Sequence, residues 1–70
     1  MAVQISRAAV QRLMGERNLT SNALASKMGI SPQALSAALG RETFSPPNVA
    51  KMAAALGVEY EDVLRKEDPE

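Results

Sequence analysis

Histidine, cysteine and tryptophan are absent from this 70-residue chain. Without cysteine, the chain has neither a disulfide nor a thiolate that could bind a metal or attack a substrate. Without histidine, it lacks the commonest metal ligand and the only side chain whose ordinary pKa lies near pH 7. The sequence also shows no nucleophile paired with a base. We therefore expect a protein that is not an enzyme and that needs no metal or cofactor.

Long apolar runs are missing as well. No segment approaches the ~18 consecutive apolar residues of a membrane-spanning helix, and the N-terminus has no signal-peptide pattern. These absences predict a cytoplasmic protein without membrane contact. Apolar residues still make up 46% of the chain, but only Phe44 and Tyr60 are aromatic. At this length we expect one small domain, with a core of aliphatic side chains and methionine.

The net charge is zero, but the charges are unevenly distributed along the chain. Residues 1–51 carry six basic and two acidic side chains, whereas residues 52–70 carry two basic and six acidic ones. A polyanion would be attracted to the first part and repelled by the last. The last four residues contain too little apolar material to order themselves. We expect a folded domain over residues 1–66 and a disordered acidic tail over residues 67–70.

Apolar residues recur with the 3.6-residue period of amphipathic helices, and residues typical of helix ends separate the periodic stretches. Ser6 is a suitable N-cap for the first helix, and Asn18 suits a left-handed ending. Either Thr20 or Ser21 can cap the second helix, and Gly40 is placed to end the third. The pattern predicts five short helices, over residues 6–18, 20–28, 32–39, 45–56 and 60–65.

The stretch KMGISPQALS, residues 27–36, interrupts a sequence that is otherwise helical. Gly29 can adopt the positive φ that turns the chain out of the second helix, and Ile30 supplies an apolar side chain beneath the corner. Ser31 can cap the third helix and Pro32 presets its first turn. The small Ala25 lets the two helices cross closely. Two short helices joined by a three-residue turn make a helix-turn-helix unit.

The segments LTSNALASKMGISPQALSAAL and SPPNVAKMAAALGVEYEDVL carry a resemblance that covers roughly residues 9–64. They are similar to the phage repressor and Cro-type (XRE) helix-turn-helix family. The resemblance implies an all-α, compact five-helix lambda-repressor-like domain from a bacterium or phage, associated with the nucleoid when it is bound to DNA. It also implies that the third helix enters the major groove of double-stranded DNA, with the protein acting as a homodimer.

The resemblance also assigns roles to individual positions. Pro32, Gln33, Ser36 and Ala37 match the face that meets base edges. Ser21 and Asn22 match positions that bond phosphates, and Arg41 and Thr43 match the loop that touches the DNA backbone. With the nearby cations and the cap of the third helix, the expected DNA-binding residues are Arg17, Ser21, Asn22, Lys27, Ser31, Pro32, Gln33, Ser36, Ala37, Arg41 and Thr43.

Each assignment has a simpler alternative. The amide of Gln33 can bond adenine N6 and N7 together, or it can be an ordinary solvated residue of a helix. Ala37 can meet a thymine methyl group or serve only as a good helix former. Ser21 and Asn22 can bind phosphate or merely cap their own helix. Arg17 and Lys27 can face DNA or simply keep the protein soluble.

Two functions remain open from these residues. The first is a sequence-specific DNA-binding transcriptional regulator, a repressor that binds a near-palindromic operator as a dimer. The alternative is a protein-interaction or antitoxin-like partner module that binds DNA only weakly. The alanine-rich third helix and the acidic tail favour this alternative. No small-molecule ligand is inferred for either function.

Overall fold

The computed structural model describes residues 2–65 of the chain. These residues form four α-helices, α1 (Arg7–Glu16), α2 (Ser21–Met28), α3 (Pro32–Arg41) and α4 (Pro46–Leu56). They also form three shorter elements, the strands β1 (Val3–Gln4) and β2 (Thr43–Phe44) and the 3₁₀ helix η1 (Tyr60–Val63). The acidic tail expected over residues 67–70 lies outside the described residues, so its disorder stays a prediction.

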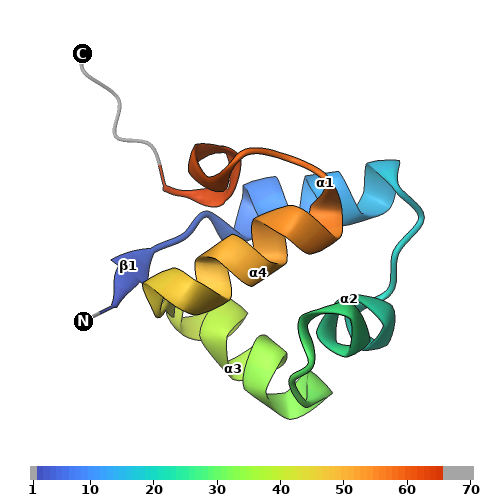
Figure 1. Cartoon of the computed structure of the whole chain (residues 1–70), viewed down its shortest axis with the longest axis horizontal. Helices are drawn as coiled ribbons and strands as arrows, with labels where there is room; N and C mark the ends of the chain where they lie inside the picture. The colour runs from blue at the N-terminus through green and yellow to red at the C-terminus, as the bar shows by residue number, and fades with distance from the viewer. Residues whose placement is uncertain (1, 66–70) are drawn as a thin grey trace.

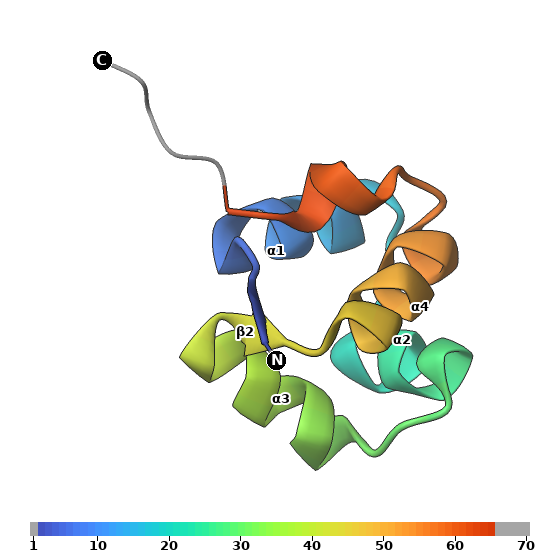
Figure 2. The same cartoon turned by 60° about the vertical axis from the view of Figure 1, so that its left-hand side comes forward.

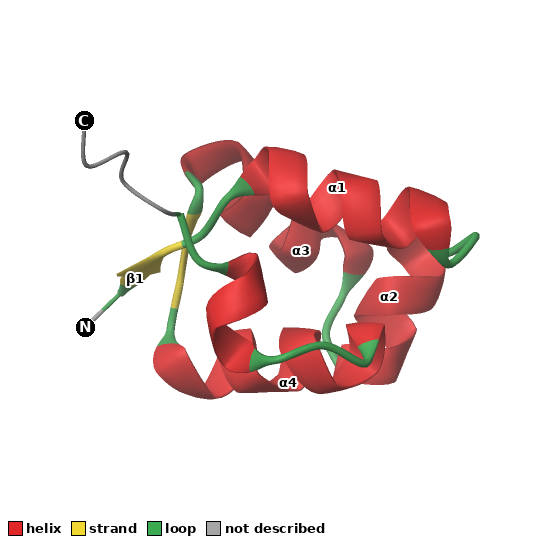
Figure 3. Ribbon diagram, turned by 90° about the horizontal axis from the view of Figure 1, so that it is seen from above, coloured by secondary structure: helices red, strands yellow, loops and turns green. Residues whose placement is uncertain are grey.

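The helices are arranged around a shared interior (Figure 1). Figures 1 and 2 both place α1 and η1 at one edge of the molecule and α3 at the opposite edge. Seen from above, η1 lies between α1 and α4 (Figure 3). The helix-turn-helix pair therefore occupies one side of the molecule, and α1 and η1 occupy the other.

Every α-helix contributes apolar side chains at helical spacing to one buried cluster, which confirms the periodicity found in the sequence. No polar or charged residue among residues 2–65 is buried. Met14, Met28 and Met52 all lie in the core, where their flexible side chains fill irregular space. The cluster consists of Ile5, Val10, Leu13, Met14, Leu24, Ala25, Met28, Leu35, Ala38, Leu39, Phe44, Val49, Met52, Leu56 and Val63.

The ends of α1 and the start of α2 follow the local signals of the sequence. The Oγ of Ser6 accepts a hydrogen bond from the Ala9 N–H at 3.1 Å. Asn18 adopts a φ of 57°, which confirms the left-handed ending of α1. At α2 the structure selects Thr20 as the N-cap, because its Oγ1 accepts from the Ala23 N–H at 3.1 Å. Ser21 is therefore the first helical residue, and its side chain does not cap the helix.

The interruption between α2 and α3 has the predicted geometry. Gly29 adopts a φ of 74°, a conformation that costs a side-chain-bearing residue free energy. The Ile30 N–H then donates to the Ala25 carbonyl at 3.0 Å, which closes the end of α2. The Oγ of Ser31 accepts from the Ala34 N–H at 3.1 Å and begins α3. Residues 29–31 thus form a three-residue turn, and α3 leaves α2 as a separate helix.

The predicted end of the third helix was wrong. The helix continues through Gly40 to Arg41, and Glu42 takes the left-handed conformation with a φ of 58°. Two contacts from the N-terminal segment hold Glu42 there. The Ile5 N–H donates to its carbonyl at 2.8 Å, and the Arg7 N–H donates to its carboxylate at 3.1 Å. Contacts across the fold therefore outweigh the preference of glycine for this conformation.

The predicted all-α class is confirmed, because most of the described residues are helical, but two details differ. The fifth helix, expected over residues 60–65, is only the 3₁₀ turn η1, because Leu64 is extended and forms a bridge with Ile5. A small antiparallel sheet is added, in which Val3 pairs with Phe44 and Gln4 pairs with Thr43. Helical signals in the sequence do not reveal such pairing, since the strands are two residues long and lie far apart in the chain.

Candidate nucleic-acid interface

Helix α3 has one buried face and one exposed face. Leu35, Ala38 and Leu39 are buried in the core and fix the orientation of the helix. Gln33, Ala37 and Gly40 follow one another at intervals of four and three residues, so they lie along the opposite side. All of the following α3 residues are exposed, and together they are called the α3 face: Pro32, Gln33, Ala34, Ser36, Ala37, Gly40 and Arg41.

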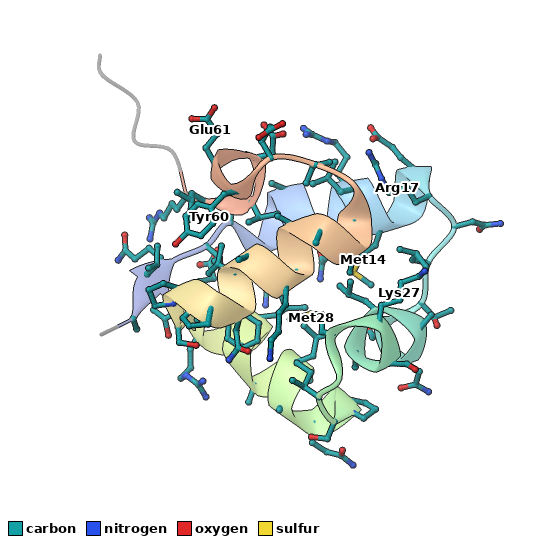
Figure 4. All side chains as sticks on the ribbon, in the orientation of Figure 1. Met14, Arg17, Lys27, Met28, Tyr60 and Glu61 are labelled. Carbon is teal, nitrogen blue, oxygen red and sulfur yellow. The ribbon has the colours of Figure 1, made fainter. Side chains whose placement is uncertain are left out.

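Negative charge is absent from the part of the chain that carries the α3 face. The sequence contains no aspartate or glutamate from residue 17 to residue 41, a segment that covers α2, the turn and α3. Of its three basic side chains, Arg17 pairs with Glu16, whereas Lys27 and Arg41 are exposed and form no salt bridge within the described residues. The acidic residues Glu61 and Asp62 belong to η1, at the edge opposite α3 (Figure 4). A polyanion that approaches α3 therefore meets positive charge first.

Glu42 is the acidic residue next to the α3 face. Its carboxylate accepts the Arg7 N–H at the first turn of α1, where the positive end of the helix dipole partly offsets the charge. This contact also ties the C-terminal end of α3 to the start of α1. No sequence pattern indicates it, since the two residues are 35 positions apart.

The residues predicted to bind DNA fall into three groups in the structure. Ser31, Pro32, Gln33, Ser36, Ala37 and Arg41 lie on or immediately before α3 and are all exposed. Ser21, Asn22 and Lys27 are exposed on α2, which packs against α3. Thr43 follows α3 in β2 and is half-buried. These residues stay predictions, and the structure brings ten of the eleven to the helix-turn-helix pair and its flanks.

Arg17 is the exception, because it lies at the end of α1 on the side away from α3 (Figure 4). Its Nε donates to the Leu56 carbonyl at the end of α4, and its Nη1 donates to the Leu13 carbonyl at 3.4 Å. The guanidinium thus lies at the C-terminal ends of two helices, where a cation is favoured by the helix dipoles. These contacts give Arg17 a structural role that the sequence did not reveal.

Arg17→Ala is expected to lower the free energy of unfolding by about 1 kcal/mol, because the charged hydrogen bonds to two helix ends are lost. The Arg17 side chain is 34% exposed, so solvent screens these bonds only in part. Arg12→Ala is the matched control, since Arg12 and Arg17 both pair with Glu16 but the Arg12 side chain is 69% exposed. It should change stability by less than about 0.5 kcal/mol. Urea unfolding followed by circular dichroism measures both. Equal effects of the two substitutions would contradict the structural role of Arg17.

Two short helices joined by a tight turn, the second with a buried inner face and an exposed outer face, are the defining feature of helix-turn-helix DNA-binding domains. The family model described as the Cro/C1-type HTH DNA-binding domain matches residues 4–69. This match covers nearly the whole chain, and the chain belongs to that family. Searches of curated proteins and of solved structures give no match.

Two further observations concern other classes of site. No helix among the described residues has the length and apolarity that crossing a membrane requires. Within the same residues, no group of three or more aspartate, glutamate, histidine or cysteine side chains is arranged to hold a metal ion.

Proposed function

We propose that this protein is a sequence-specific transcriptional regulator that represses by binding a near-palindromic operator as a homodimer, in the cytoplasm and on the nucleoid. The observation that carries the proposal is the α3 face, which is exposed along the helix and lies within residues 17–41, a segment without carboxylates. A helix of this kind fits the major groove, where base edges present distinct patterns of donors, acceptors and methyl groups. The protein acts by occupying DNA and has no catalytic step.

Gln33 and Ser36 supply the hydrogen-bonding groups of the α3 face. The Gln33 amide suits adenine, to which it can donate and accept at the same time, and the Ser36 hydroxyl suits several bases. Both side chains are exposed and have no partner among the hydrogen bonds of the described residues. They are therefore available to an outside ligand without breaking an internal contact.

Phosphate contacts come from the start of α2 and from the basic side chains. The amide groups of Ser21 and Asn22 lie in the first turn of α2, where backbone N–H groups have no acceptor within the helix. Such a helix end attracts phosphate. Arg41 in the last turn of α3 and Lys27 in the last turn of α2 add positive charge. Because few cations are available per subunit, we expect modest non-specific affinity and a shallow dependence on salt.

Selecting bound sequences from a pool of random duplexes tests the proposal. Repressor function predicts enrichment of a two-fold symmetric site with half-sites about 34 Å apart, one turn of DNA. Band-shift titration of the selected duplex should then show one complex that contains two copies of the protein. Asymmetric enrichment with one copy per duplex would contradict the homodimer.

The control is a selection from the same pool with the double variant Gln33→Ala and Ser36→Ala, which lacks the two hydrogen-bonding side chains of the α3 face. Because both positions are exposed, the variant should still fold. The enrichment should disappear because the groups that bond the bases are gone. If the unchanged protein enriches no sequence even at low salt, the operator function is wrong and the interaction-module alternative is favoured. Copurification with one specific protein would then support that alternative.

A further inference from the structure

Gly40 lies inside α3, although the fold does not require a glycine there. Its φ is not positive, unlike those of Gly29 and Gly57. A Cβ added at Gly40 would meet no atom within 4 Å. Alanine would stabilise the helix at such a position, because glycine loses more backbone entropy on folding. The internal structure therefore gives no reason for the missing side chain.

Gly15 in α1 has the same two properties, so an open glycine in a helix does not by itself indicate a binding site. The position of Gly40 distinguishes it. Gly40 follows Ala37 by three residues and Gln33 by seven, along the outward line of the α3 face. Ala37 carries only one methyl group beyond its backbone. Such a short side chain can touch a base only if the helix axis comes close to the groove floor.

We propose that Gly40 allows α3 to approach DNA closely, so that Ala37 packs against the C5-methyl group of a thymine in the operator half-site. This inference rests on the proposed function. It adds that the thymine C5-methyl group is the part of the base that the apolar side chain of the α3 face contacts. A side chain at position 40, one turn along the same line, would hold the helix away from the groove. Ala37 would then no longer reach the thymine methyl group.

The first arm of the test compares Gly40→Ala with the matched control Gly15→Ala in the full chain. Both substitutions are expected to raise the thermal midpoint by several degrees, since each replaces an unobstructed helical glycine with the best helix former. Gly15→Ala should leave affinity for the selected duplex within twofold. Gly40→Ala should weaken that affinity at least tenfold even though it makes the protein more stable.

The second arm replaces the thymidines of the selected duplex with deoxyuridine, which removes only the C5-methyl groups. The unchanged protein should lose about fourfold in affinity for each methyl group that was buried. The loss should shrink in the Ala37→Gly variant, because the side chain that contacts the methyl group is already absent. Thermal unfolding confirms that this variant is folded at the temperature of the titration.

The outcomes separate the inference from the proposed function. Unchanged affinity of Gly40→Ala, or an affinity that is the same for thymidine and deoxyuridine duplexes, overturns the inference while operator binding stands. Loss of affinity in Gly15→Ala as large as in Gly40→Ala also overturns it. If the unchanged protein binds no duplex at all, the proposed function is wrong and the inference falls with it.

Discussion

Leu35→Ala is expected to remove about half of the stability of this domain. Leu35 is fully buried on the inner face of α3 and belongs to the central cluster. Replacing such a leucine with alanine costs about 2–5 kcal/mol, because the transfer free energy is lost and a cavity remains. A domain of this length has a total stability of roughly 4–10 kcal/mol. The variant should therefore unfold at a much lower urea concentration.

Urea titration followed by far-ultraviolet circular dichroism measures this effect. Ser36→Ala is the matched control, since it changes the neighbouring residue of the same helix at an exposed position. Its free energy of unfolding should change by less than about 0.5 kcal/mol. A cost below about 1 kcal/mol for Leu35→Ala would show that α3 is not anchored through this side chain.

Gln33→Ala should reduce affinity for the selected operator by roughly 5- to 150-fold, the range expected when a bidentate pair of hydrogen bonds to adenine is removed. Affinity for an unrelated duplex should change by less than twofold, because phosphates and not base edges determine non-specific binding. Gln11→Ala, at an exposed position of α1, is the control for removing a glutamine from a helix surface. Band-shift titrations with both duplexes supply the comparison.

Arg41→Ala should behave differently at the same interface. Because the guanidinium would neutralise a phosphate, its removal should weaken binding to the operator and to an unrelated duplex alike. The slope of log affinity against log salt should become shallower by about 0.9 for each phosphate that is no longer neutralised. Arg12→Ala, on α1, should leave that slope unchanged. If neither Gln33→Ala nor Arg41→Ala reduces operator binding, the α3 face is not the DNA-binding surface.

The N-terminal segment influences the same interface from a distance. The Ile5 N–H and the Arg7 N–H both bond Glu42, so the end of α3 is fixed by residues at and before the start of α1. Val3 and Gln4 extend this connection by pairing with β2. A change at the start of the chain can therefore shift the end of α3 without touching the α3 face. Variants of the interface should be compared in chains with the same N-terminal segment.

Local signals in the sequence determined the helix-turn-helix. Gly29, Ser31 and Pro32 act through their own backbone or that of the next few residues, so their roles could be predicted one helix at a time. The apolar period likewise predicted which side of α3 is buried, and Gln33 is exposed as the pattern required. For this reason, the α-helices and the exposure of the candidate interface residues could be predicted from the sequence.

Only the tertiary structure decided the features that depend on contacts between distant segments. Glu42 ends α3 in place of Gly40 because the N-terminal segment, 35 positions away, bonds its carboxylate. Arg17 bonds the end of α4 across 39 positions, whereas the sequence offered it as a DNA-facing cation or as an ordinary solubilising charge. Such contacts arise when folding brings distant segments of the chain together. No local periodicity or capping residue encodes which distant partner will be met.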